Sequence, residues 1–296
     1  MQSSIKNIRA INENEYQLLW ETNSGAVFQN AFWLNMVISA REKVEYYGYY
    51  SQDTLMDAFA IVKLKGFFFT NYTLPIFTPC LGWIKQSVDP NFIVEFLRKQ
   101  KPDAIYYAAK QEAVGWSSGT TFVIDLQESL DQLHKNIRQD KKRSIKKAIT
   151  QPLAISFKKD FETIQRLVKR TYERQGKQFD GYKELQKIIE IYPNSFQITV
   201  SDEKTDLASL LFVYDKTTAY YLIGGFDYEA NNYAAGPYAM WKGIEYSKQL
   251  NLKIFDFEGS EIPSIAQYFQ SFGGIQKHYY SISKYGFIFS LLKKYR

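Results

Sequence analysis

Residues 219–259 carry two strand patterns separated by a helix pattern, and this β-loop-α-β unit constrains the fold of the chain most strongly. The strands are expected over residues 219–227 and 253–259, where apolar and aromatic residues dominate. The helix is expected over residues 237–250, with Pro237 in its first turn, where the missing N–H has no intrahelical role. The unit predicts a mixed α/β chain whose strands share a sheet.

Both halves of the chain show the same coarse order of helices, antiparallel strands, a crossover helix and a further strand. In the first half, strands over residues 44–53 and 55–75 pair around a turn at 51–53. We therefore predict an α/β (α+β) chain of two similar domains, residues 1–124 and 125–296, with mixed, mainly antiparallel sheets.

The chain contains few residues of the types that bind metals or act as nucleophiles. It has 296 residues, 45% of them hydrophobic, with one cysteine, Cys80, and two histidines, His134 and His278. A single cysteine excludes an internal disulfide framework and any cysteine-rich metal site, so we predict no metal centre. The N-terminal segment lacks the apolar core of a signal peptide, and no run of about 18 apolar residues occurs, so a cytoplasmic location is expected.

The stretch KIFDFEGS, residues 253–260, combines the character of a buried strand with two carboxylates. Strict alternation would put Asp256, Glu258 and Ser260 on one face of the strand. A buried carboxylate is costly unless it is paired or used in chemistry. Asp256 and Glu258 are therefore candidate general bases, and the alternative is that one of them pairs with a lysine or caps backbone groups.

The helix that begins at AAGPY offers an anion site made of backbone alone. Its first N–H groups have no partner inside the helix, and the helix dipole favours negative charge there. Gly236 would let a ligand approach the backbone closely, and Tyr238 lies in the same turn. Both are candidate binding residues, although Gly236–Pro237 also suits an ordinary helix start.

A cationic face is expected on a helix over residues 130–149. Its apolar side faces away from a row of basic residues, with Arg138 near the boundary: Lys135, Lys142, Arg143, Lys146 and Lys147. So dense a positive face repels itself and favours an anionic partner such as phosphate groups or nucleic acid, in keeping with the net charge of +6. The alternative is a solvated, lysine-rich face.

From this helix onward, the second half resembles the FemAB-type acyltransferases, a branch of the GNAT (Gcn5-related N-acetyltransferase) superfamily. The matching pieces follow in order over residues 125–285: RQDKKRSIKKA, LVKRTYERQGKQF, LIGGFDYEANNYAAGPYAMWKGIEYSKQLNLKIFDFEGS and YFQSFGG. VFQNAFWLNMV, residues 27–37, resembles the N-terminal segment of the family more weakly. The resemblance implies two GNAT-like domains in tandem and transfer of an acyl or aminoacyl group to an amine.

In a GNAT fold, the strand over 253–259 would splay from the strand over 219–227, and acyl donors lie in that gap. The resemblance implies acyl-CoA or aminoacyl-tRNA as donor. The acceptor would be a small-molecule or lipid-linked amine of a metabolite or of the cell envelope, including peptidoglycan. Asp256 and Glu258 are the base candidates in this setting. Candidate residues for binding donor or acceptor are Arg138, Lys142, Arg143, Arg174, Gly236, Tyr238, Ser260 and Gln270.

The sequence also departs from family patterns. The GNAT pyrophosphate loop, Gln/Arg-x-x-Gly-x-Gly/Ala, is absent, and NNYAAGPY is at best a degenerate form. Phe269–Gln270 stands where FemAB-type enzymes that use aminoacyl-tRNA often have Phe-Lys, and glutamine supplies no charge to a tRNA end. The long helical arm of some peptidoglycan-bridge enzymes is also missing from the sequence.

A rival function is a degenerate GNAT pair that binds RNA or another polyanion through the basic face without turnover. A peripheral membrane contact is suggested by YGFIFSLLKKYR, residues 285–296, where apolar residues stand beside three basic ones. A terminal helix packed on the core is the alternative for this segment. The sequence leaves the oligomeric state undefined.

Overall fold

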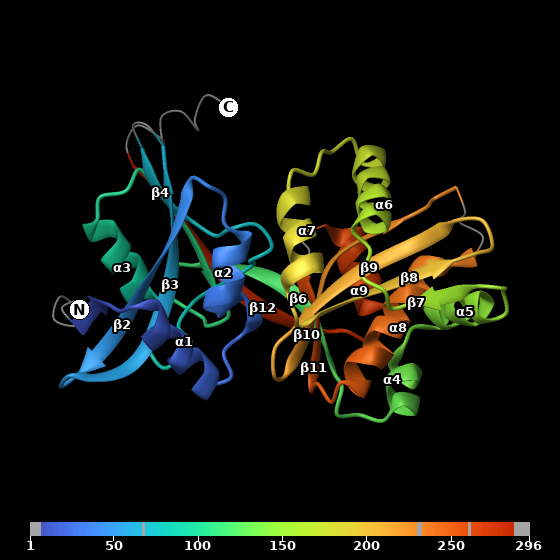
Figure 1. The fold of residues 1–296 in the computed structure, drawn as a ribbon. Coiled ribbons are helices and arrows are strands. Elements are labelled where there is room, and N and C mark those ends of the chain that lie inside the picture. The colour runs from blue at the N-terminus through green and yellow to red at the C-terminus, as the bar shows by residue number, and fades with distance from the viewer. Residues whose placement is uncertain (1–6, 67–68, 230–232, 260–261, 287–296) are drawn as a thin grey trace. The chain divides into compact units, whose positions relative to one another are not determined.

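The structure is a computed structural model that describes residues 7–66, 69–229, 233–259 and 262–286 (Figure 1). It divides into two compact units, Met1–Gly119 with His278–Arg296, and Thr120–Lys277. Strand β6 (Ser117–Asp125) carries the chain from the first unit into the second, and strand β12 (Ile275–Tyr285) carries it back. The predicted boundary at residue 124 falls inside β6, and the return of the last strand to the first unit was not predicted.

The first unit contains strands in the order β1-β2-β3-β4-β5-β12. Its remaining elements are β1 (Ile8–Ala10), α1 (Glu13–Thr22), a 3₁₀ turn (Val27–Gln29), α2 (Ala31–Val37), β2 (Glu42–Ser51), β3 (Thr54–Lys65), β4 (Thr70–Thr73), α3 (Asn91–Lys99) and β5 (Ala104–Ala109). These strands pair antiparallel, apart from the parallel pair β4 and β5. Gln52 and Asp53 adopt the left-handed backbone that two-residue hairpins require, so the predicted hairpin is confirmed.

The second unit contains strands in the order β6-β11-β10-β9-β8-β7. Its remaining elements are α4 (Leu130–Asn136), α5 (Gln139–Ile149), β7 (Ala154–Ser156), α6 (Phe161–Arg174), α7 (Tyr182–Ile191), β8 (Ser195–Ser201), β9 (Asp206–Tyr214), β10 (Thr218–Phe226), α8 (Ala235–Gln249), β11 (Ile254–Gly259) and α9 (Pro263–Gln270). Here β10 and β11 form the parallel pair, and the other pairs are antiparallel. The predicted fold class of mixed, mainly antiparallel sheets is confirmed, and both units repeat the order of antiparallel strands, helix and parallel strand.

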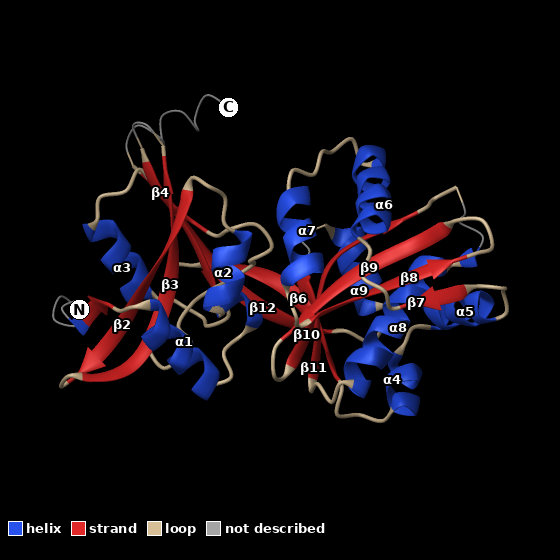
Figure 2. Ribbon diagram, in the orientation of Figure 1, coloured by secondary structure: helices blue, strands red, loops and turns tan. Residues whose placement is uncertain are grey.

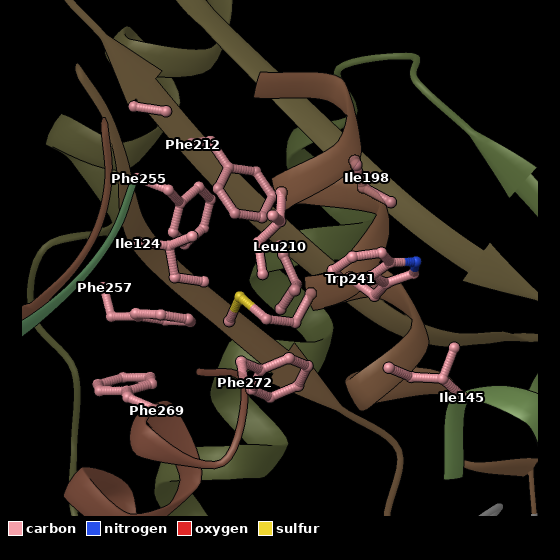
Figure 3. Packing of buried hydrophobic residues seen from close by; sticks show 14 of the residues in the cluster. Ile124, Ile145, Ile198, Leu210, Phe212, Trp241, Phe255, Phe257, Phe269 and Phe272 are labelled. Carbon is pink, nitrogen blue, oxygen red and sulfur yellow. The ribbon is translucent and has the colours of Figure 1, made fainter. Parts of the chain in front are cut away.

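Helices cover both faces of the sheet in the second unit (Figure 2). On one face, α8 packs over a core of large apolar side chains (Figure 3), which includes Phe122, Ile124, Leu210, Phe212, Trp241, Phe255, Phe257, Phe269 and Phe272. An added Cβ at Gly224 would meet Leu210 of this core, whereas one at Gly225 would lie 2.1 Å from the carbonyl carbon of Leu167 on α6. Because successive strand residues point to opposite faces, α6 lies on the other face of β10.

The prediction of a single helix over residues 130–149 is wrong, because the chain breaks between α4 and α5. Ile137 and Arg138 have extended backbone, with ψ of 136° and 145°. Ile137 is buried in the core, and the Arg138 N–H donates to the Ser271 carbonyl at 2.9 Å instead of to a carbonyl one turn back. The Lys142 ammonium donates to the Lys135 carbonyl at 2.9 Å and so satisfies the end of α4. Tertiary packing therefore overrides the helical periodicity at this point.

The apolar and basic segment at the C-terminus lies, beyond residue 286, outside the described residues. Membrane contact by this segment therefore stays a prediction. Within the described ranges, none of the helices has the length and apolarity needed to cross a bilayer.

We expect Gly225→Ala to destabilise the second unit, because its Cβ would collide with the backbone of α6 rather than with a side chain that can rotate. Overpacking of this kind costs about 1–3 kcal/mol. Chemical denaturation measures the loss, and Val114→Ala, at a residue 91% exposed, is the control expected to change stability by less than about 0.5 kcal/mol. An unchanged midpoint for Gly225→Ala would contradict the close contact between α6 and β10.

Candidate functional site

Strands β10 and β11 pair briefly and then part. Their parallel ladder begins at Thr218↔Ile254 and ends at Tyr220↔Asp256, although β10 continues to Phe226 and β11 to Gly259. The predicted splay of these two strands is confirmed. Beyond residues 220 and 256, the backbone N–H and C=O groups on the facing edges of β10 and β11 lie outside the β10–β11 ladder. They can therefore form hydrogen bonds to a ligand that runs between the strands.

Each of the two strands is irregular where they part. β10 shifts its register against β9 between Tyr221 and Ile223, and β11 shifts against β6 between Asp256 and Gly259. Such bulges bend a strand and end its pairing. Glu258 adopts the left-handed conformation at φ 61°, which is uncommon for a residue other than glycine and redirects the chain here.

The bend at Glu258 corrects the prediction of strict alternation over residues 253–260. Alternation holds through Phe257, because Phe255 and Phe257 both lie in the core and Asp256 points to the opposite side. At Glu258 the left-handed backbone redirects the chain, so Asp256 and Glu258 do not share a face by strand geometry. Glu258 is half-buried, and Ser260 lies outside the described residues.

Asp256 is a buried carboxylate that holds this bend. Its Oδ1 accepts a hydrogen bond of 2.6 Å from the Thr121 hydroxyl on β6 and one of 3.0 Å from the backbone N–H of Glu258. Charge-assisted bonds of this kind are strong and fix geometry. The structure thus shows Asp256 capping a backbone group, which is one of the two roles that the sequence left open, and its part in catalysis stays a prediction.

The first turn of α8 lies at the open end of β10. Helix α8 begins at Ala235, after Ala234 in left-handed backbone, and an added Cβ at Gly236 would lie 2.4 Å from the ring of Phe226. Glycine at 236 therefore lets the helix start pack against the last residue of β10. The N–H groups of Ala235 and Gly236 stand at the positive end of the helix, since Pro237 has no N–H and the Tyr238 N–H bonds to Ala234. An anionic group bound here would lie beside the parted strands.

Four tyrosines from separate elements lie around the same region, and because they are far apart along the chain, no sequence motif indicated this group. Tyr172 lies on α6, Tyr221 on β10, Tyr228 just after β10 and Tyr268 on α9. Burial raises the pKa of Tyr221 above its usual range, and the charges of Tyr172 and Tyr228 raise it further. The pKa of Tyr268 is raised well above its usual range by burial and then by Tyr221 and Tyr228. The raised pKa values keep the hydroxyls of Tyr221 and Tyr268 protonated at neutral pH, so both can donate a hydrogen bond.

The predicted basic residues separate into two groups. The Arg174 guanidinium lies over the ring of Tyr228, with its central carbon 3.6 Å from the ring centroid, which places it at the tyrosine group. Arg138 instead forms a two-pronged ion pair with Asp140, at 2.6 and 2.8 Å, and this pairing holds the pKa of Asp140 at about 2. Lys142 caps α4 and Arg143 is exposed on α5. Gln270, the last residue of α9, is also exposed.

The middle of the chain is similar to a known protein family. Residues 135–269 match the family described as the acetyltransferase (GNAT) domain. The matched stretch makes up less than half of the chain. It contains α5, the parted strands and the start of α8, so the family match and the geometry of the site coincide. No curated protein sequence matches the chain.

Solved structures share the fold of the whole chain at low sequence identity. FemX is 11% identical with a TM-score of 0.75, and the likeness covers 97% of this chain and 99% of that one. The tandem GNAT protein from the clavulanic acid biosynthesis pathway is 7% identical with a TM-score of 0.56, covering 93% and 98%. The N-myristoyltransferase of Saccharomyces cerevisiae is 12% identical with a TM-score of 0.51, covering 94% and 82%. The predicted fold of two GNAT-like domains in tandem is confirmed.

The first unit also has a parallel pair, but its own chain fills the space next to it. β4 and β5 pair at Asn71↔Ala104 and Tyr72↔Ile105, after which the Leu81 N–H donates to the Ala108 carbonyl of β5 at 2.9 Å. The amide of Gln29, which is buried, donates to the Leu81 carbonyl at 2.7 Å and holds this segment in place. The parted strands of the second unit are therefore the better candidate for a GNAT donor site.

We expect Thr121→Val to lower the free energy of unfolding by about 2 kcal/mol, because it removes a hydrogen bond to a buried carboxylate. Thr121→Ser keeps the hydroxyl and is the matched control. Urea denaturation of both variants measures the difference. Equal stability of the valine and serine variants would show that the Thr121–Asp256 bond does not hold the bend.

The ion pair between Arg138 and Asp140 at the start of α5 predicts a lowered pKa for the Asp140 carboxyl. In a carbon-detected NMR titration, the side-chain carboxyl of Asp140 should titrate with a pKa of about 2, and Arg138→Gln should raise that pKa toward the ordinary value. High salt should raise it in the parent protein as well, because both side chains are exposed. An Asp140 pKa that is the same in the parent protein and in Arg138→Gln would contradict the pairing.

Proposed function

We propose that the protein is an N-acyltransferase that moves an acyl group from acyl-CoA to a primary amine, with the reaction at the parting of β10 and β11. The observation that carries the proposal is the end of the ladder at Tyr220↔Asp256 while both strands continue. The amide-containing arm of CoA can run between the strands and bond to the backbone groups of their edges. The thioester would then lie next to the bends at Tyr221–Ile223 and Glu258.

The start of α8 is proposed to bind the pyrophosphate of the donor. The N–H groups of Ala235 and Gly236 and the helix dipole suit an anion, even though the sequence there is a degenerate form of the usual loop. Acyl-CoA as the class of donor is supported by the structural neighbour from Saccharomyces cerevisiae, an N-myristoyltransferase with bound myristoyl-CoA. Gln270 is uncharged and exposed, so this position does not supply the positive charge that would favour aminoacyl-tRNA as the donor.

Glu258 is proposed as the general base, with Asp256 as the residue that positions it. The attacking amine nitrogen forms a bond to the acyl carbon, the bond from carbon to sulfur breaks, and the amine proton passes to Glu258 or a water bound to it. The thiolate leaves and takes up a proton. Backbone N–H groups at the bulge of β10 would stabilise the negative charge on the acyl oxygen during attack. Holding both reactants in the gap supplies the remaining rate enhancement.

The acceptor is proposed to be an amine of a metabolite or of the cell envelope, small or lipid-linked, as the FemAB-type resemblance implies. The rival function, polyanion binding without turnover, is less well supported. The basic face that suggested it is divided between α4 and α5, and Arg138 is paired with Asp140. A shallow dependence of RNA binding on salt would count further against it.

Donor binding and transfer can be measured separately. Isothermal titration with acetyl-CoA and longer acyl-CoAs should give saturable binding at one site, and incubation with a panel of primary amines should yield free thiol and acylated amine by mass spectrometry. Aminoacyl-tRNA serves as the comparison donor. Binding of aminoacyl-tRNA together with no binding of any acyl-CoA would overturn the proposed donor.

We expect Glu258→Gln to lower kcat for acyl transfer by about 10²–10⁴-fold, because the variant cannot accept the amine proton. Its dissociation constant for acyl-CoA should be unchanged. The double variant Asp256→Asn with Glu258→Gln should have no measurable transfer. Glu203→Gln, in the exposed turn before β9, is the control with full activity. Full activity in the double variant would remove both carboxylates from the mechanism.

A further inference from the structure

The hydroxyl of Tyr268 is buried and has no hydrogen-bond partner among the described residues. Tyrosine hydroxyls usually find a partner when they are buried, since an unsatisfied polar group in the interior is destabilising. Tyr268 lies on α9 directly before Phe269, whose ring centroid is 6.1 Å from that of Tyr221 on β10 and 4.9 Å from that of Phe257 on β11. The orphaned hydroxyl is therefore carried by the helix that packs on both parted strands.

The rings of this group already have cations on them. The Lys141 ammonium lies 5.0 Å from the centroid of the Tyr268 ring, and the Arg174 guanidinium lies 3.6 Å from that of Tyr228. Three of the carboxylates beside these residues in the sequence form ion pairs: Asp140 with Arg138, Asp227 with Arg170 and Glu173 with Lys169. An incoming ammonium group would thus be repelled by the positive charges of Lys141 and Arg174.

We propose that Tyr221, Tyr228 and Tyr268 form a subsite that binds a hydrogen-bond-accepting oxygen of the substrate, such as a carbonyl, hydroxyl or carboxylate oxygen, and disfavours an ammonium group. Tyr268 donates the hydrogen bond that its hydroxyl otherwise lacks. The inference rests on the proposed function, because it assigns this subsite to a substrate of acyl transfer. The oxygen belongs either to the acyl group of the donor or to the amine acceptor beyond its reacting nitrogen.

Two matched series of probes separate these sources. The donor series is butyryl-CoA, 3-hydroxybutyryl-CoA and 3-aminobutyryl-CoA, and the acceptor series is propylamine, ethanolamine and ethylenediamine. Within each series the three compounds differ at one position. That position carries a hydrogen in butyryl-CoA or a methyl group in propylamine, a hydroxyl in the second compound and an ammonium group in the third. Binding to the full chain is measured by calorimetry for the donors and by ligand-observed NMR for the acceptors, so neither arm requires turnover.

We expect the hydroxyl compound to bind about tenfold more tightly than the ammonium compound in one of the two series, which identifies the source of the oxygen. Tyr268→Phe should abolish that preference without lowering the melting temperature, because it removes only an unpartnered hydroxyl. Tyr214→Phe, on β9, is the matched control that keeps the preference. A preference retained in Tyr268→Phe, or a preference for ammonium, overturns the proposal, as does equal binding within both series.

The two proposals can fail separately. If no acyl-CoA binds, the proposed function fails, and the acceptor series still decides the subsite. If acyl-CoA binds and is used, but neither series shows the preference for a hydroxyl, the proposed function stands and the subsite is rejected.

Discussion

Two parallel strands normally keep their hydrogen bonds for as long as both run, because an unpaired backbone group inside a protein is destabilising. Here β10 and β11 stop pairing at Tyr220 and Asp256 and continue apart. Three features favour the parting: the register shift in β10, the left-handed backbone at Glu258, and the Asp256 carboxylate, which accepts from Thr121 and from the Glu258 N–H. The candidate site depends on this local loss of pairing.

The surrounding packing keeps the parted strands in place. Gly225 lets the backbone of α6 lie against β10 on one face, and Gly236 lets the start of α8 lie against Phe226 at its end. On the core side, Phe257 stacks on Phe269 of α9 with ring centroids 4.9 Å apart. The first unit has the same order of elements, but Leu81 there bonds to the strand that follows its parallel pair. The two units thus share a topology but differ next to the parallel pair. In the second unit the strand edges there are open, and in the first unit the segment at Leu81 bonds to β5.

Sequence reasoning predicted the features that depend on local periodicity and on chain order. These include the hairpin at 51–53, the helix with Pro237 in its first turn, the tandem fold and the splay of β10 from β11. It failed where tertiary contacts decide the conformation. Ile137 turns into the core and interrupts a helix that its periodicity would continue, and Glu258 takes a left-handed backbone that no residue pattern indicates. Tyr268 gave no signal either, because its neighbours come from β10 and from the loop that follows it.

The most direct test of this account is a crystal structure of the protein with acetyl-CoA bound. The account predicts that the amide-containing arm runs between β10 and β11, with bonds to the backbone of residues 221–226, and that the pyrophosphate lies at the N–H groups of Ala235 and Gly236. It would be contradicted by acetyl-CoA bound beside β4 and β5 of the first unit, or by β10 and β11 paired along their whole length in the complex.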